Sequence, residues 1–319
     1  MAMRVWLRVD LPADEPATLQ REFPEVEFLV GDTISDGVLA KTDAIFLTRM
    51  PEEDVIERMS GLRWLHSTMG GARGMLTDAV KKRPILVSTS RGAQATPMSE
   101  FAIACMLTLR KRILTCRELQ AEKKAKEIAA LRPEVMEGAT VFIVGLGAIG
   151  LAVAQKCQAL GMRVVATKLR VTERPAYVDE VHTPEHFTKL AQTADVVVFC
   201  APATPLTKGI VSDELLRGMK RSSVIINLVT RNAVEDEAAI VKALKEERIA
   251  GAAFSVGSEA PSPAPESELW DLPNVIVCPG MAAYDPRKWQ RLREIFVANL
   301  RRFQAGEPLL NLGDAKAGY

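Results

Sequence analysis

The fold of this chain is decided by the stretch Val141-Phe142-Ile143-Val144-Gly145-Leu146-Gly147-Ala148-Ile149-Gly150. Its apolar start predicts a buried β-strand, and its glycines lead directly into the apolar positions of a helix over 151–160. A GxGxxG pattern alone occurs in many glycine-containing loops, but between a strand and a helix it is typical of dinucleotide binding. The context therefore favours a cofactor-binding turn over a glycine turn without a ligand.

Each residue of this turn has a physical role. Gly145 permits the tight bend, Gly147 lets the backbone approach a pyrophosphate, and Gly150 allows the helix to pack closely on the strand. The helix start at Ala148 and Ile149 offers unpaired N–H groups and a partial positive charge to phosphates. We therefore predict that these five residues bind the pyrophosphate of a nicotinamide dinucleotide.

The region around the turn is a series of strand, turn and helix units. Apolar strands are expected at 141–144, 163–166, 177–181, 196–200, 223–227, 251–254 and 274–278. Such alternation is typical of an α/β protein with a doubly wound parallel sheet that helices cover on both faces. We predict a Rossmann dinucleotide-binding domain here.

The first hundred residues predict a second, smaller α/β unit. Apolar runs at 4–9, 26–30, 44–47, 64–65 and 85–87 are expected as strands, with a helix at 52–59. A helix starts near Thr96, where Pro97 and Glu100 occupy its first turn, and we expect it to continue through 114 and along the charged stretch 118–126. A final helix is expected over 286–304, before a polar tail.

Length and composition narrow the function classes. A chain of 319 residues exceeds the usual size of one domain, and 48% hydrophobic with 25% charged residues is ordinary for a globular enzyme. The 41 cationic and 40 acidic residues leave no strong field for nucleic acid or an anionic membrane. No apolar stretch reaches the roughly 18 residues of a membrane span, so we expect a cytoplasmic protein. The five scattered cysteines are expected to be reduced thiols.

The end of the second Rossmann strand decides which dinucleotide is expected. An acid at this position accepts hydrogen bonds from the ribose hydroxyls of NAD(H), but this chain has Thr167-Lys168-Leu169-Arg170. A hydroxyl and two cations suit the 2′-phosphate of NADP(H) instead. Thr167, Lys168 and Arg170 therefore favour NADP(H); NAD(H) remains the alternative if the basic loop is only solvated surface.

The chain resembles the D-2-hydroxyacid dehydrogenase family over nearly its whole length. The matching stretches, in order, are 95–114, 141–161, 200–205, 225–228, 251–253 and 269–275. The resemblance implies a discontinuous, flavodoxin-like substrate domain formed by 1–97 plus 285–319, a Rossmann domain formed by 98–284, and a homodimer. It also implies that the cofactor lies beside Ala201, Pro202, Val229, Thr230, Ser255 and Gly280.

Family members transfer hydride between the C2 carbon of a 2-hydroxy acid and the nicotinamide. The resemblance implies an arginine that holds the substrate carboxylate and a histidine, paired with a glutamate, that exchanges the hydroxyl proton. The corresponding positions here are Thr230, Ala260 and Gly280, so the usual relay cannot operate in its standard form. Arg231 and Glu259 are adjacent, and each could serve if its loop shifts by one residue.

Other polar residues are candidates to replace this chemistry. Tyr284 follows Gly280 by four residues and is either a proton donor or a packed aromatic side chain. His66 is either catalytic or structural; it precedes the loop in which the N–H groups of Gly70 and Gly71 would bind a substrate carboxylate. Further candidate cations near the expected cleft are Arg49, Arg73 and Arg91, although solvated surface charge is the favoured interpretation of each one taken separately.

Three functional hypotheses remain open at this point. The first is an NADP(H)-linked oxidoreductase that acts on a small anionic substrate with non-standard residues. The second is an inactive relative that binds the dinucleotide as a sensor, scaffold or regulatory partner, and the third is a non-hydride, lyase-type reaction in the same pocket. His182 and His186 have the spacing of metal ligands on a helix, but no third ligand is evident, so no metal is expected.

Overall fold

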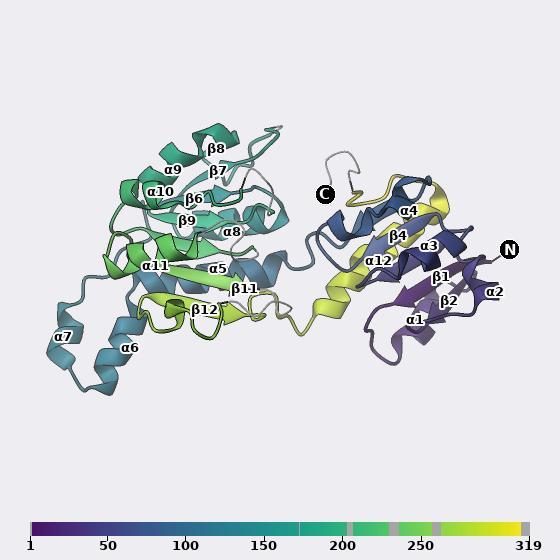
Figure 1. The fold of residues 1–319 in the computed structure, drawn as a ribbon, viewed down its shortest axis with the longest axis horizontal. Helices are drawn as coiled ribbons and strands as arrows, with labels where there is room; N and C mark the ends of the chain where they lie inside the picture. Colours follow the sequence, from purple (N-terminus) through teal and green to yellow (C-terminus); the bar gives the residue numbers. More distant parts are fainter. Residues whose placement is uncertain (1, 172, 203–206, 230–235, 257–262, 314–319) are drawn as a thin grey trace. The chain divides into compact units, whose positions relative to one another are not determined.

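A computed structural model describes residues 2–171, 173–202, 207–229, 236–256 and 263–313 (Figure 1). The chain forms two compact units: unit 1 is Met1–Gln94 with Asp285–Tyr319, and unit 2 is Ala95–Tyr284. The boundaries at 97 and 284 stay a prediction for the two domains. Among the described helices, none is long and apolar enough to cross a membrane.

Unit 1 is built on a five-stranded parallel sheet in the order β2-β1-β3-β4-β5. Its strands are β1 (Met3–Arg8), β2 (Val26–Val30), β3 (Ala44–Leu47), β4 (Trp64–Ser67) and β5 (Leu86–Thr89). This order is the flavodoxin-like arrangement, in which the chain reverses its direction of winding beside the first strand. The predicted smaller α/β unit is therefore confirmed.

Helices cover both faces of this sheet. They are α1 (Glu15–Glu22), α2 (Asp36–Leu39), α3 (Glu53–Arg58), η1 (Arg73–Met75), α4 (Asp78–Lys81) and α12 (Lys288–Ala305). Val5 and Leu7 point to one face and pack with α1 and α12. Trp6, between them, points to the other face and packs with α2, α3 and α4. This alternation gives the unit two apolar layers, as the two-residue period of a strand requires.

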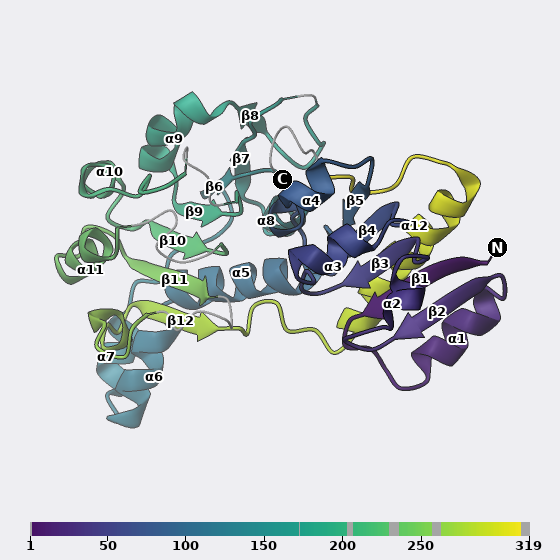
Figure 2. The same cartoon turned by 45° about the vertical axis from the view of Figure 1, so that its right-hand side comes forward.

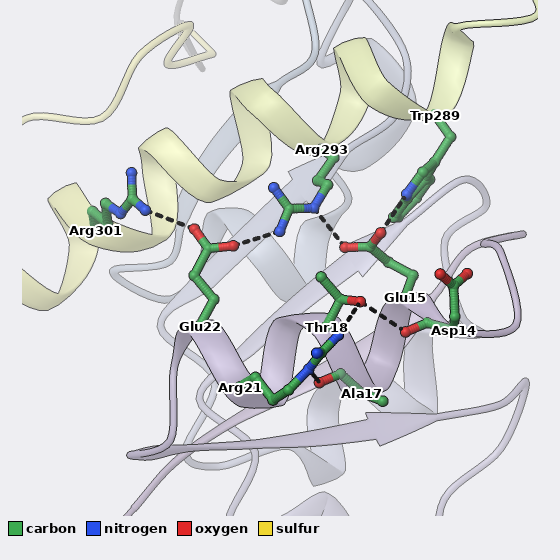
Figure 3. Close-up of polar contacts among 9 residues, drawn as sticks. All are labelled: Asp14, Glu15, Ala17, Thr18, Arg21, Glu22, Trp289, Arg293 and Arg301. Atoms are coloured by element: carbon green, nitrogen blue, oxygen red, sulfur yellow. Dashed lines mark hydrogen bonds and ion pairs between the residues drawn. The ribbon is translucent and has the colours of Figure 1, made fainter.

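Polar contacts attach the C-terminal helix α12 to the N-terminal helix α1 (Figure 3). Glu15, which is 7% exposed, accepts hydrogen bonds from Arg293 Nε at 2.6 Å and Trp289 Nε1 at 3.0 Å. Glu22 accepts hydrogen bonds from Arg293 and, at 2.6 Å, from Arg301 Nη2. These charge-assisted contacts join segments about 270 residues apart in sequence into one unit.

Unit 2 contains a seven-stranded parallel sheet in the order β12-β11-β10-β9-β6-β7-β8. Its strands are β6 (Thr140–Val144), β7 (Arg163–Thr167), β8 (Glu180–His182), β9 (Val196–Phe199), β10 (Val224–Asn227), β11 (Gly251–Val256) and β12 (Val275–Pro279). The winding reverses between β6 and β9. Ligands of doubly wound sheets bind at the carboxyl ends of the strands beside such a switch point.

Helices also cover both faces of the unit 2 sheet. They are α5 (Ala95–Arg110), α6 (Ile113–Ala121), α7 (Ala125–Ala130), α8 (Ala148–Ala159), η2 (Pro184–His186), α9 (Phe187–Thr193), α10 (Asp213–Gly218), α11 (Glu237–Lys245) and η3 (Glu268–Trp270). Val141 and Ile143 pack with α5 and α8, whereas Phe142 and Val144 pack with α9, α10 and α11. The predicted doubly wound Rossmann architecture is confirmed.

Two expected elements differ from the structure. The linking helix ends at Arg110, because Arg112 has a left-handed backbone (φ +54°) that starts the separate helix α6. Figures 1 and 2 show α6 and α7 as an arm extending from the sheet of unit 2. The third Rossmann strand is Glu180–His182 rather than 177–181, because the N–H group of Val178 donates to Pro175 in a turn.

Candidate active site

The glycine turn lies at the carboxyl end of β6, at the switch point. The N–H groups of Gly145 and Leu146 donate to the carbonyl oxygen of Thr167 at 3.1 and 3.2 Å, which fixes the turn against β7. Gly145 has φ +98°, and a Cβ atom there would lie 2.6 Å from the backbone nitrogen of Ala201. Both the backbone conformation and the close approach of the loop after β9 therefore require glycine.

Gly150 and Gly147 are required for different reasons. A Cβ atom at Gly150 would lie 2.2 Å from the carbonyl oxygen of Gly145, so this glycine lets α8 pack on the turn. A Cβ atom at Gly147 would meet nothing within 4 Å, and its φ of −90° is open to any residue. Packing within the described residues does not require glycine at this position.

Gly147 is also the residue that precedes α8, and it brings no side-chain cap to the helix. The first N–H groups of an α-helix have no partner within the helix, so those of Ala148 and Ile149 are available to a ligand. The helix dipole adds partial positive charge at this end. Backbone geometry therefore makes a phosphate cradle at the switch point.

The predicted 2′-phosphate residues follow β7, next to this cradle. Thr167 is only 4% exposed, and its carbonyl oxygen holds the glycine turn. Lys168 is half-buried and its N–H group donates to the carbonyl oxygen of His182 at 2.9 Å, whereas Arg170 is exposed. The two cations are therefore the accessible members of the predicted set.

The remaining predicted cofactor residues lie at the carboxyl ends of the other strands. Ala201 and Pro202 follow β9, Val229 follows β10, and Ser255 pairs with Cys278 of β12. Because the strands are parallel, these ends meet at the edge that carries the glycine turn. Beside Ala201, burial and the nearby Cys157 raise the pKa of the Cys200 thiol, so Cys200 is not a thiolate at neutral pH.

Gly280, which the resemblance places at the family's histidine position, has a left-handed backbone. Gly280 directly follows Pro279, which pairs with Val256 at the end of the sheet, and has a left-handed φ of +69°. A histidine would be strained in this conformation. Tyr284 lies one turn further on, with its N–H group bonded to the carbonyl oxygen of Met281 at 3.1 Å and its side chain 75% exposed. Thr230, Arg231, Glu259 and Ala260 lie outside the described residues.

His66 lies in β4 of unit 1 and is completely buried. Its Nδ1 is 2.7 Å from Ser88 Oγ and its Nε2 is 3.1 Å from Ser90 Oγ. Burial lowers the pKa of His66 to about 3, so the imidazole is neutral at physiological pH. Both ring nitrogens are occupied, which favours the structural interpretation of His66 over the catalytic one.

The predicted carboxylate loop follows His66. Within the described residues, the N–H groups of Gly70 and Gly71 have no hydrogen-bond acceptor, and a Cβ atom on either would meet nothing within 4 Å. Two such N–H groups on an open loop suit an anion. Arg49 follows β3 and is exposed, and its carbonyl oxygen accepts a hydrogen bond from Arg8 at 2.6 Å. Arg73 begins η1, the next element after this loop.

One contact of the site region escaped the sequence interpretation. Arg91, after β5, donates from Nε to Oδ1 of Asn311 at 3.3 Å. The two residues are 220 positions apart, and an asparagine in a polar tail carries no local signal of such a role.

His182 and His186 also come together, with ring centroids 5.1 Å apart. His182 Nε2 is 2.7 Å from a carboxylate oxygen of Glu180. Across the described part of the chain, no group of three or more His, Cys, Asp or Glu residues is arranged to hold a metal ion.

Comparison with known proteins assigns the chain to a family. Residues 103–282 match the family described as "D-isomer specific 2-hydroxyacid dehydrogenase, NAD binding domain". A glyoxylate reductase of Korarchaeum cryptofilum is 31% identical over 272 residues, which are 83% of this chain and 80% of that protein. A glycerate dehydrogenase of Methylorubrum extorquens is 30% identical over 262 residues, which are 80% of each chain.

A solved structure covers the whole chain. It is a D-isomer specific 2-hydroxyacid dehydrogenase from Xanthobacter autotrophicus in complex with NADPH and MES, with a TM-score of 0.84, 25% identity and complete coverage of both chains. The matched domain, the two relatives and the fold agree with the glycine turn at the switch point. This chain therefore belongs to the D-isomer specific 2-hydroxyacid dehydrogenase family.

Proposed function

We propose that the chain is an NADP(H)-linked oxidoreductase that interconverts a small 2-oxo acid and its 2-hydroxy acid with non-standard catalytic residues. The observation that carries this proposal is the open backbone of Gly147 at the start of α8, next to the cations after β7. The relatives named as glyoxylate reductase and glycerate dehydrogenase support the substrate class. The NADPH in the related solved structure supports the cofactor.

The residues at the carboxyl edge of unit 2 fit a phosphorylated dinucleotide. The N–H groups of Gly147, Ala148 and Ile149 would hold the pyrophosphate, and Lys168 with Arg170 would hold the 2′-phosphate. Ala201, Pro202, Val229, Ser255 and Gly280, at the same edge, would line the rest of the site. When bound, the nicotinamide supplies or accepts the hydride.

In unit 1, the N–H groups of Gly70 and Gly71 would hold the substrate carboxylate. Arg231 and Glu259 keep their proposed roles as replacements for the usual arginine and glutamate. His66 is assigned no proton transfer, because it is buried and both of its ring nitrogens contact serine hydroxyls.

The test of the proposed function is a kinetic comparison. We expect glyoxylate and hydroxypyruvate to be reduced with NADPH, seen as loss of absorbance at the cofactor wavelength, at a lower KM for NADPH than for NADH. Tight NADPH binding without turnover of any 2-oxo acid would support the dinucleotide-binding sensor instead. Product formation with no net cofactor oxidation would support lyase-type chemistry.

The preference for NADPH is expected to depend on Lys168. The variant Lys168→Ala loses a cation at the 2′-phosphate position, so its Kd for NADPH should rise roughly 10-fold. Its Kd for NADH should stay unchanged, because NADH has no 2′-phosphate. Lys189→Ala, which removes an exposed lysine of α9 in the same unit, is the control. Equal losses for both dinucleotides would assign Lys168 a general structural role.

The proposed proton donor of the reduction is Tyr284. The phenol of Tyr284 is 75% exposed and is therefore free to contact a substrate. Gly280, four residues earlier, has no imidazole that could act as the proton donor instead. We expect Tyr284→Phe to lower kcat by roughly 100-fold with little change in the Kd for NADPH. An unchanged kcat would remove Tyr284 from the mechanism.

We also propose that the chain forms a homodimer through the arm of α6 and α7. Neither helix has a buried residue within one chain, and the apolar side chain of Ile113, at the start of α6, is 52% exposed. A second copy of the arm would cover such apolar side chains. Sedimentation equilibrium should give twice the chain mass of 34.9 kDa, and Ile113→Arg should shift the protein toward the single-chain mass.

A further inference from the structure

The tail after α12 packs along the edge of the unit 1 sheet. The carbonyl oxygen of Asn311 accepts a hydrogen bond from the N–H group of Thr89 at 3.1 Å, and the N–H group of Gly313 donates to Val87 at 2.8 Å. Between them, Leu312 forms an antiparallel bridge with Ser88. The tail therefore continues the sheet beyond β5.

The start of this tail is fixed by a buried amide of α12. Asn299 is completely buried; its Oδ1 accepts from the N–H group of Leu310 at 2.7 Å, and its Nδ2 donates to the carbonyl oxygen of Leu310 at 3.1 Å. Both polar groups of the Asn299 side chain are thus used on one tail residue. The position of Asn311, the next residue, is set by this pair of hydrogen bonds.

Asn311 in turn holds Arg91 at two points. Its Oδ1 accepts from Arg91 Nε at 3.3 Å, and its Nδ2 donates to the carbonyl oxygen of Arg91 at 2.9 Å. Asn311 has the left-handed φ of +54°, which asparagine tolerates better than most residues. Within the described residues, the two terminal nitrogens of the exposed Arg91 have no acceptor. Arg91 is therefore held through Nε, and its two terminal guanidinium nitrogens are available to a ligand.

The loop that carries Arg91 adjoins the loop that carries Gly70 and Gly71. The N–H group of Ser90 donates to the carbonyl oxygens of Ser67 at 2.8 Å and Met69 at 3.0 Å, which ties the loop after β5 to the loop after β4. The tail touches that loop as well, because a Cβ atom at Gly313 would lie 2.7 Å from the Cβ atom of Ala72. Unpaired backbone N–H groups and an unpaired guanidinium end therefore lie on adjoining loops of one unit.

We propose that Arg91 binds the substrate carboxylate together with the N–H groups of Gly70 and Gly71, and that Asn311 is the residue that positions Arg91. The proposal rests on the proposed function and names the carboxylate-binding residue of that site. A guanidinium fork pairs with both oxygens of a carboxylate. Holding the fork in advance lowers the conformational entropy that binding would otherwise cost. Arg91 thus adds a guanidinium to the carboxylate-binding N–H groups of unit 1, in addition to the role proposed for Arg231.

The test measures binding of oxamate, a non-reducible carboxylate, to the full chain loaded with NADPH by titration calorimetry. Arg91→Gln should raise the Kd of oxamate roughly 10- to 100-fold, because a charge-assisted hydrogen-bond pair is lost. The Kd of NADPH should not change, since the glycine turn lies in unit 2. An unchanged melting temperature of unit 1, followed by tryptophan fluorescence, shows that the variant is folded. Arg21→Gln is the control, because Arg21 is an exposed arginine of unit 1 whose hydrogen bonds, among the described residues, lie within α1.

The positioning role of Asn311 has its own test. Asn311→Gly keeps the left-handed backbone available and removes only the side chain, so oxamate binding should weaken several-fold with an intact tail. Arg91→Lys should restore part of the affinity lost in Arg91→Gln, because it keeps the charge. In the Arg91→Lys background, which lacks Nε, Asn311→Gly should have a smaller effect, because only its hydrogen bond to the carbonyl oxygen of residue 91 is then lost. An equal loss in both backgrounds would show that Asn311 acts only through the tail and would overturn its positioning role.

Failure of this proposal is distinguishable from failure of the proposed function. If the parent chain and Arg91→Gln bind oxamate equally while 2-oxo acids are reduced, Arg91 is not the carboxylate ligand and the enzyme assignment stands. If the parent chain binds NADPH but neither binds oxamate nor reduces any 2-oxo acid, the carboxylate site of the proposed function is wrong and the role of Arg91 falls with it.

Discussion

Alanine at position 147 is expected to raise the Kd for NADPH by roughly 100-fold while leaving the thermal stability of unit 2 unchanged. The φ of Gly147 is −90°, and a Cβ atom there would meet nothing within 4 Å, so the fold accepts Gly147→Ala. The same Cβ atom would stand where the pyrophosphate approaches the backbone. The loss is therefore expected in binding alone.

Gly145→Ala is the matched comparison. Its Cβ atom would lie 2.6 Å from the backbone nitrogen and 2.7 Å from the Cα atom of Ala201, at a φ of +98°. These backbone atoms cannot move aside as the end of a flexible side chain can. We therefore expect unit 2 to lose about 3 kcal/mol or more of stability. Cofactor affinity should fall as a consequence of this damage.

The two variants are separated by measuring the melting temperature without cofactor and the Kd for NADPH by fluorescence titration. The expected pattern is a normal melting temperature with weak binding for Gly147→Ala, and a lowered melting temperature for Gly145→Ala. Normal NADPH binding by Gly147→Ala would mean that no phosphate approaches this backbone, and the cofactor site at the switch point would have to be abandoned.

This contrast shows how far the glycine pattern could be interpreted from sequence. The roles of Gly145 and Gly150 follow from short distances that any βα turn of this kind imposes, so strand, turn and helix were predictable together. The strands were predictable for a similar reason: residues such as Val141 to Val144 are buried on both faces of the sheet and must all be apolar.

The predicted ends of helices and strands are wrong where contacts distant in the sequence outweigh the local pattern of residues. The linking helix stops at Arg110, before the left-handed Arg112, and the buried guanidinium of Arg110 donates to the carbonyl oxygens of Val135, Asp195 and Ser222, none of which is near in sequence. No glycine or proline marks the break at Arg112. Val178 is apolar and fully buried, as a strand residue would be, but its N–H group bonds within a turn.

The residues of the candidate site also differ in how far the sequence predicts them. Backbone sites, such as the glycine turn and the Gly70–Gly71 loop, leave a pattern in the sequence because glycine is needed locally. Side-chain partners do not: nothing around Asn311 indicates that it contacts Arg91. The burial of His66 was equally invisible, since a histidine at the end of an apolar strand can face either core or solvent.

That burial predicts a large loss of stability of unit 1 at mildly acidic pH. The pKa of His66 is lowered to about 3 by burial, whereas a histidine in an unfolded chain titrates near 6.5. As the pH falls below 6.5, the unfolded state takes up a proton that the folded state does not, so stability decreases toward pH 3. Between pH 6 and pH 4 this single group should cost about 2–3 kcal/mol.

The measurement is denaturant unfolding followed by tryptophan fluorescence, because Trp6, Trp64 and Trp289 belong to unit 1 and only Trp270 to unit 2. His66→Gln has no group that titrates in this range, so the pH dependence of its unfolding free energy should be smaller than that of the parent chain by this amount. His186→Gln, which removes an exposed imidazole of unit 2, should keep the parent's dependence.

Neutral His66 also supports the carboxylate loop. Trp64 Nε1 can only donate, so Ser88 Oγ accepts from it at 2.8 Å and has its own proton available for His66 Nδ1. The imidazole proton then lies on Nε2, directed at Ser90 Oγ, and the N–H group of Ser90 bonds to the carbonyl oxygen of Met69. Protonating His66 would require Nδ1 to donate to Ser88 and would break this order. Because the folded state takes up this proton only near pH 3, the affinity of the folded parent chain for oxamate should stay constant from pH 6 to pH 4 while unit 1 loses stability. An affinity that falls in parallel with stability over this range would show that His66 is protonated in the folded state.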